Sequence, residues 1–213
     1  MTEDDVLAAL GTVYDPELDE PITALRFVAS CEVADSGAVS VRLRLPTPQC
    51  APNFAYLMAA DARDAVLAVP GVGAVSVVLE DHYTGAEINA AVGRGGGFAD
   101  AFPGETAGDL RALRELFQRK ALLARQSRLL ASPATTLGEL SGPDADRCRA
   151  LRRALGIDAS DDAPAFVTGD GTPVAASDVR FRRMASLTAL SLDTNGGMCR
   201  DLLKTRYGEE VAA

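Results

Sequence analysis

The sequence predicts an α+β protein, in which a small α/β domain is followed by a mostly helical domain. Within residues 1–80, apolar side chains alternate at strand spacing in three short segments and recur at helical spacing in one, and a capping pattern opens a further helix. After a glycine-rich stretch, the apolar residues of the second half recur mainly at helical spacing. We therefore expect domains at residues 1–92 and 105–213, joined by a linker at 93–104.

The first domain is expected to follow the order helix, strand, strand, helix, strand. Thr2 and the acids after it form a capping pattern that opens a helix to about Leu10. Strand periodicity covers 27–33, 39–45 and 75–79, and helical periodicity covers 54–69. This order predicts one sheet with helices covering one of its faces.

The second domain is expected to be helical with one short hairpin. Helices are predicted from Thr106 to about Ala131, over 143–155, and from Ser177 to about Tyr207 with a break at 195–197. The hairpin is predicted over 165–174. The first of these helices is long and has a broad apolar face, which suits either the backbone of a bundle or an oligomer interface.

Composition limits the class of protein. The acidic N-terminus lacks the basic and apolar regions of a signal peptide, and no apolar run approaches the roughly 20 residues that span a bilayer. The four cysteines (residues 31, 50, 148 and 199) are far apart in sequence, so we expect neither a disulfide framework nor a zinc knuckle. These features predict a cytoplasmic protein with reduced thiols that does not bind membranes.

The net charge of −9 is concentrated in the first half. Residues 1–104 contain 5 Arg and Lys against 15 Asp and Glu, a net −10, whereas residues 105–213 contain 16 against 15, a net +1. An acidic surface repels phosphate, so we expect no nucleic-acid partner. Two aromatic residues, Phe98 and Phe102, lie in the linker, where they either pin it to one domain or dock a partner.

Cys50 is the main candidate for chemistry. It lies between the end of the second predicted strand and a helix that Pro52 opens. A thiol at a helix N-terminus meets the positive end of the helix dipole, which favours the thiolate, the form that binds metals or carries sulfur. The alternative is a buried structural cysteine, since free cysteine is commonly buried.

The other titratable candidates have simpler explanations. Cys31 shares a face with apolar residues of its strand and is expected in the core. Cys148 and Cys199 lie in predicted helices and are expected to pack there, unless they meet near Cys50 and form a multi-thiol site. His82, the only histidine, could bind iron, but a surface position at the end of the third strand is the simpler interpretation.

Three segments in order carry a family resemblance. They are Asp15-Pro16-Glu17-Leu18 after the first helix, Leu45-Pro46-Thr47-Pro48-Gln49-Cys50 after the second strand, and Val69-Pro70-Gly71-Val72 before the third. In these segments the first 90 or so residues resemble the SufT- and PaaD-type family of iron–sulfur cluster assembly proteins. The chain departs from the family pattern at Gln49, where glycine is usual, and it has no cysteine-rich tail.

The resemblance implies a non-enzymatic factor that assembles iron–sulfur clusters or delivers iron or sulfur to a client metalloprotein through Cys50. Asp15, Glu17 and Thr47 would support the turn beside it, although Asp15 could equally be a turn-capping residue and Glu17 a solvated loop acid. A cluster needs four ligands. One Cys50 per chain would therefore act in a homodimer, in a site shared with the client, or in transient transfer of iron or sulfur.

The main alternative is a non-catalytic adaptor or chaperone that binds one metalloenzyme, by analogy a multicomponent oxygenase. An enzyme is the third choice, because Gly93–Gly97 lacks the lysine and the strand–helix context of a nucleotide-binding loop. With one histidine, no serine–histidine nucleophile pair is evident.

Overall fold

The chain forms two compact units, each with hydrophobic cores of its own. The structure is a computed structural model that describes residues 1–105 and 109–208. One unit contains Met1–Leu110 and Gly196–Ala213, and the other contains Arg111–Asn195. The domain boundaries expected from sequence, at 92 and 105, stay a prediction.

The first unit has the predicted order of elements. It contains helix α1 (Glu3–Leu10), strands β1 (Val28–Val33) and β2 (Ala38–Arg44), helix α2 (Pro52–Leu67), strand β3 (Ala74–Glu80), and helices α3 (Gly85–Gly93) and α4 (Phe98–Ala101). Thr2 caps α1 as predicted: its hydroxyl accepts from the Asp5 amide at 3.3 Å, and the Asp5 carboxylate accepts from the Thr2 amide at 2.7 Å.

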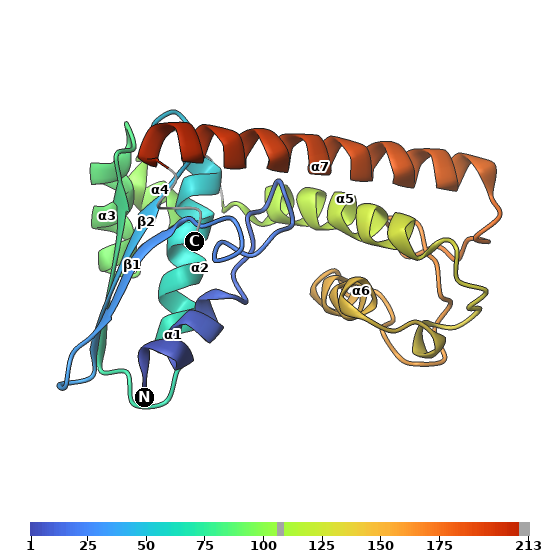
Figure 1. Ribbon diagram of the computed structural model, residues 1–213, viewed down its shortest axis with the longest axis horizontal. Helices are drawn as coiled ribbons and strands as arrows, with labels where there is room; N and C mark the ends of the chain where they lie inside the picture. Colours follow the sequence, from blue (N-terminus) through green and yellow to red (C-terminus); the bar gives the residue numbers. More distant parts are fainter. Residues whose placement is uncertain (106–108, 209–213) are drawn as a thin grey trace. The chain divides into compact units, whose positions relative to one another are not determined.

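The three strands form one sheet in the order β1-β2-β3 (Figure 1). β1 and β2 are antiparallel, as their short turn requires, whereas β2 and β3 are parallel and are joined by the crossover helix α2. Val41 at the centre of β2 lies opposite Cys31 on one side and Val77 on the other.

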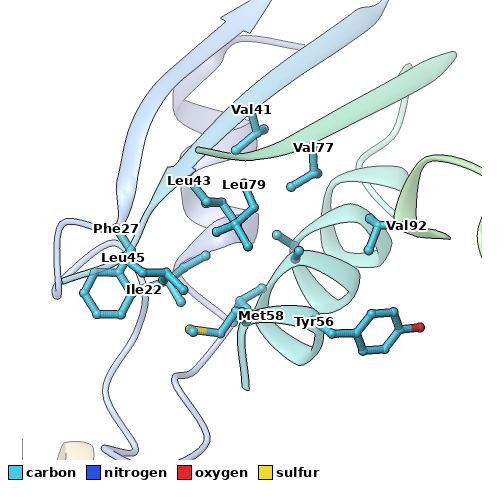
Figure 2. Packing of buried hydrophobic residues seen from close by; sticks show 14 of the residues in the cluster. Ile22, Phe27, Val41, Leu43, Leu45, Tyr56, Met58, Val77, Leu79 and Val92 are labelled. Atoms are coloured by element: carbon cyan, nitrogen blue, oxygen red, sulfur yellow. The ribbon is translucent and has the colours of Figure 1, made fainter. Parts of the chain in front are cut away.

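The two faces of the sheet differ in polarity. On the inner face, Val41, Leu43, Val77 and Leu79 pack against α2, as Figure 2 shows. On β2 and β3, the opposite face carries Arg42, Arg44 and Glu80, and the Arg44–Glu80 ion pair measures 2.8 Å. The alternation predicted from sequence is therefore confirmed for the buried face of β2 and β3, whereas Val78 of β3 is 37% exposed.

The glycine-rich segment packs against the first unit. The Tyr56 hydroxyl donates to the Gly96 carbonyl at 2.8 Å. The Phe98 ring lies 5.5 Å from that of Tyr56 and 4.9 Å from that of Phe102, measured between ring centroids. The interpretation that the two aromatic residues pin this segment is thus confirmed.

The second unit is mostly helical. It contains α5 (Arg111–Leu129), a 3-10 turn (Leu137–Glu139), α6 (Pro143–Ala154) and the first part of α7 (Val179–Tyr207). The predicted cap of its first helix, Thr106–Gly108, lies outside the described residues. At the predicted hairpin, Val167 and Pro173 form one isolated bridge and the arms are not strands.

Two polar side chains are fully buried in the second unit. The Gln126 side chain bonds both the amide and the carbonyl of Val167, at 2.8 and 3.0 Å. The Arg152 guanidinium donates to the carbonyls of Pro164 and Ala165, each at 2.8 Å. These bonds join α5 and α6 to the irregular segment after α6. They supply hydrogen-bond partners to backbone groups of that segment, which buried backbone groups need.

The predicted break at Asn195–Gly197 is wrong, because α7 is continuous from Val179 to Tyr207. A Cβ at Gly196 would lie 2.9 Å from a carboxylate oxygen of Glu20. Glycine at this position therefore permits the close approach of another segment, and packing overrides its weak helix propensity. No helix in the described part of the chain is both long and apolar enough to cross a membrane.

Candidate functional site

Cys50 lies in the connection between β2 and α2, one residue before Ala51, the N-cap of α2. Its side chain is partly exposed, and its Sγ lies 3.6 Å from the Thr47 hydroxyl oxygen. The Cys50 amide donates to the Thr47 carbonyl at 3.4 Å, which forms a tight turn. Cys50 and Thr47, paired as candidates from sequence, are therefore in direct contact.

His82 holds the Cys50 backbone from the other side. Its Nε2 lies 2.8 Å from the Cys50 carbonyl oxygen, which can only accept a hydrogen bond. Its Nδ1 accepts from the Thr84 amide at 3.3 Å. Nε2 therefore donates and Nδ1 accepts, which is the arrangement of the Nε2–H tautomer. Through these two contacts His82 positions the Cys50 turn.

A second link joins the same two connections, since the Tyr83 amide donates to the Pro48 carbonyl at 3.0 Å. Together with the His82 contact, it fixes the segment after β2 to the segment after β3. Parallel pairing of these strands brings both ends to one edge of the sheet, where sites of α/β sheets usually lie. Sequence reasoning had no signal for this role of His82, because the contact spans 32 residues.

Asp15 is buried at the start of a closed loop. One of its carboxylate oxygens accepts from the amides of Glu17 and Leu18, at 2.8 and 2.9 Å. Burial raises the pKa of the Asp15 carboxyl to about 6, although these hydrogen bonds oppose the shift. Asp15 therefore has the geometry of the turn-capping alternative, and Glu17 is exposed beside it.

Two of the other cysteines are core residues. Cys31 on β1 is 8% exposed, and burial raises the pKa of its thiol. Cys148 on α6 is 1% exposed and packs against Leu122 and Leu151 in the second unit. The predictions that Cys31 and Cys148 are packing residues are confirmed.

Cys199 is different, because the end of α7 returns to the first unit. Its side chain is half-buried and packs against the same core cluster as Cys50. Burial is the largest cause that raises the pKa of the Cys199 thiol to about 11, and negative charge on Asp15, Cys50 and Glu17 adds to the shift. The end of α7 thus places Cys199 against the core of the first unit.

The cysteines of the chain are not cross-linked. All four lie in the described residues, and none of them forms a disulfide. Among residues 1–105 and 109–208, no group of three or more His, Cys, Asp and Glu side chains has the geometry to hold a metal ion. The chemistry on offer is that of one accessible thiol, Cys50, in a turn that is held on both sides.

Comparison with known proteins identifies the family. The sequence profile of the family described as iron-sulfur cluster assembly protein matches residues 3–77. An uncharacterized protein of Methanocaldococcus jannaschii is 37% identical over 89 residues, which are 42% of this chain and 92% of that protein. The chain belongs to the iron–sulfur cluster assembly protein family.

A second relative has a descriptive name. It is an Fe-S protein maturation auxiliary factor of Porphyromonas gingivalis, 35% identical over 78 residues, which are 37% of this chain and 72% of that protein. No solved structure matches the chain significantly. The family supports a general role in iron–sulfur assembly, and the segment matched to it contains Asp15, Glu17, Thr47 and Cys50. His82 and Cys199 lie beyond that segment.

Proposed function

We propose that this protein is a maturation factor that delivers iron or sulfur to a client metalloprotein through Cys50. The observation that carries the proposal is the partly exposed Cys50 thiol in a turn held by Thr47 and His82. A thiol in a fixed turn can bind ferrous iron as its thiolate, or take sulfane sulfur from a persulfide donor whose thiolate leaves, and present either to a partner with little loss of conformational freedom. The cluster or iron is cargo, and the protein is not an enzyme in this proposal.

The state of the cysteines suits a cytoplasmic protein. Four cysteines without a disulfide fit the reducing cytoplasm, where disulfides are rare. Because a cluster needs four ligands, Cys50 acts with ligands from a client, a second copy of the chain or a small thiol. Asp15 and Glu17 then serve to shape the loop beside Cys50 rather than to react.

A second candidate is an adaptor that binds its client without using the thiol. Large apolar side chains of α7 support it, since Met184, Leu187 and Leu190 are each at least 60% exposed. Exposed apolar residues of this size are suited to contact with a partner protein. In this alternative, the client is a specific metalloenzyme such as a multicomponent oxygenase, and the chain would bind it equally well without Cys50.

Anaerobic reconstitution with ferrous iron and sulfide tests the first candidate. The wild-type chain is compared with Cys50→Ala, and Cys148→Ala is the matched control because Cys148 is buried in the other unit. Delivery through Cys50 predicts that iron and sulfide loading falls to background in Cys50→Ala and is retained in Cys148→Ala. Equal loading of all three chains would refute it, and retained binding of a client metalloprotein by Cys50→Ala would favour the adaptor.

A further inference from the structure

The first part of α7, residues 179–190, packs against the second unit along one side of the helix. The side chains buried there are Phe181, Ala185 and Ala189, which recur every four residues. The Phe181 ring lies 6.5 Å from that of Phe166, measured between ring centroids, and Ala189 packs against α5. This side of the helix is therefore filled by its own unit, and the opposite side is left to solvent.

The exposed side carries a row of apolar side chains. Met184, Leu187 and Leu190 are each at least 60% exposed and follow one another at a spacing of three residues. Residues three or four positions apart are neighbours on the surface of a helix, so the three side chains form one continuous apolar strip. Single exposed apolar residues are ordinary, whereas a strip opposite a packed side of the helix indicates a surface that a partner covers.

Two arginines extend this strip toward the start of the helix. Arg183 and Arg180 precede Leu187 by four and seven residues, so they lie in line with it along the helix. Both are exposed, and in the described part of the chain neither forms an ion pair. Arg182, which lies between them, instead donates to the Ala176 carbonyl at 3.1 Å. No acidic residue occurs between Arg180 and Leu187, so the exposed side is positive at one end and apolar at the other.

The position of the two arginines is unfavourable for the helix itself. Because α7 begins at Val179, Arg180 lies in its first turn and Arg183 just beyond it. Unpaired N–H groups make this end of a helix positive, which favours acidic side chains here and basic ones at the other end. The arginines therefore do not stabilise α7. Acidic side chains of a partner, placed opposite them, would relieve this repulsion.

We propose that Arg180, Arg183, Leu187 and Leu190, together the α7 docking row, bind an acidic amphipathic helix of the client protein. Its acidic side chains would lie opposite the two arginines, and its apolar side chains opposite the two leucines. Charge complementarity selects this occupant, because the row combines unpaired positive charge with an apolar strip. The inference rests on the proposed function only in taking the client as the occupant, and the docking row does not include Cys50.

Two other occupants fit the docking row less well. In helices that lie on a membrane, basic residues form a polar face opposite the apolar one, whereas Arg180 and Arg183 continue the apolar strip along the helix axis. A second copy of the chain could offer its acidic residues 1–104. Such a contact would join two different surfaces, so it would grow into rings or filaments of copies rather than a closed pair.

Fluorescence anisotropy with a labelled synthetic peptide, on the full chain, tests the docking row. The probe is a helical peptide with leucine at heptad spacing and glutamate at the flanking positions, and a second probe has lysine in place of each glutamate. We expect wild type to bind the glutamate peptide, more weakly as salt is raised, and not the lysine peptide. Affinity should fall by at least about tenfold in the double variant Arg180→Glu and Arg183→Glu, because like charges then face each other. It should fall by a similar factor in Leu187→Gln, which places a polar group in the apolar strip.

Matched controls lie elsewhere on the second unit. Arg153→Glu on α6 and Leu116→Gln on α5 change exposed side chains of the same types and should bind the glutamate peptide as wild type does. Circular dichroism should show that every variant keeps its helical content. Absence of binding, equal binding of both peptides, or wild-type affinity in the docking-row variants would overturn the proposal.

The other occupants give different results. Binding to vesicles of anionic phospholipid but not to the peptide would overturn the proposal in favour of a membrane surface. Sedimentation of wild type as oligomers that Leu187→Gln dissociates would overturn it in favour of a second copy of the chain. Iron and sulfide loading of wild type and Cys50→Ala is measured separately, so the role of Cys50 can fail while the docking row holds, and the reverse.

Discussion

The Asp15→Asn substitution should change how stability depends on pH. The Asp15 carboxyl is 7% exposed and accepts two backbone hydrogen bonds through one oxygen, which an asparagine carbonyl can also accept. Burial raises the pKa of Asp15 from 3.8 to about 6 in the folded chain. The folded state therefore binds this proton more tightly than the unfolded state does.

The sign and size of the effect follow from this pKa difference. Above pH 6 the ionised, buried carboxylate destabilises the folded state in full, and the penalty disappears as the pH falls toward 3.8. A difference of about two pKa units, at 1.36 kcal/mol each, corresponds to about 3 kcal/mol. Asparagine does not titrate. As the pH is lowered from 7.5 to 4, the free energy of unfolding of wild type should therefore rise by about 2–3 kcal/mol relative to that of Asp15→Asn.

Urea unfolding followed by tyrosine fluorescence provides a selective assay. The chain has no tryptophan, and its four tyrosines (residues 14, 56, 83 and 207) all lie in the first unit. Asp35→Asn, at an exposed position in the β1–β2 turn, is the matched control. Parallel pH profiles for wild type and Asp15→Asn would refute the reasoning, as would a carboxyl pKa near 4 for Asp15 measured by NMR.

Two further substitutions test the packing, one in each unit. Leu203→Ala, which removes a side chain that is 2% exposed in the first core, should destabilise the first unit by about 2–4 kcal/mol, measured by the same tyrosine signal. Exposed Leu202→Ala is its control, and equal effects of the two would contradict the docking of α7. Arg152→Met should leave the carbonyls of Pro164 and Ala165 unpaired and destabilise the second unit by about 2–4 kcal/mol. In Arg152→Met, amide hydrogen exchange in α6 should accelerate while exchange in the sheet does not. Unchanged exchange in α6 would contradict this role of Arg152, and exposed Arg153→Met is the control.

Local patterns were sufficient to predict most elements of the first unit. The alternation at Val39, Val41 and Leu43 predicted both a strand and its buried face, because side chains of a strand point to opposite sides in turn. The cap at Thr2 depends on residues within three positions, so it too could be recognised locally. Thr47, expected to support the Cys50 turn, lies three residues before Cys50 and contacts its thiol, so this relation is also a local one.

Contacts between distant segments could not be predicted in this way. The glycine at 196 suggested a helix end, yet α7 continues there because Glu20 approaches it closely. Helix propensity is worth only about 1 kcal/mol per glycine, which packing readily outweighs. His82 was expected at the surface, and only the parallel pairing of β2 and β3 reveals that it binds the Cys50 backbone.

The order of elements, the capped first helix and the choice of Cys50 thus came from the amino-acid sequence alone, because each depends on residues near one another along the chain. The docking of the α7 end onto the first unit depends on Arg200 and Arg206, whose partners lie 125 to 180 residues away. Such contacts depend on how the chain folds back on itself, and no local pattern encodes them. Only the tertiary structure could therefore show that Cys199 packs against the core of the first unit.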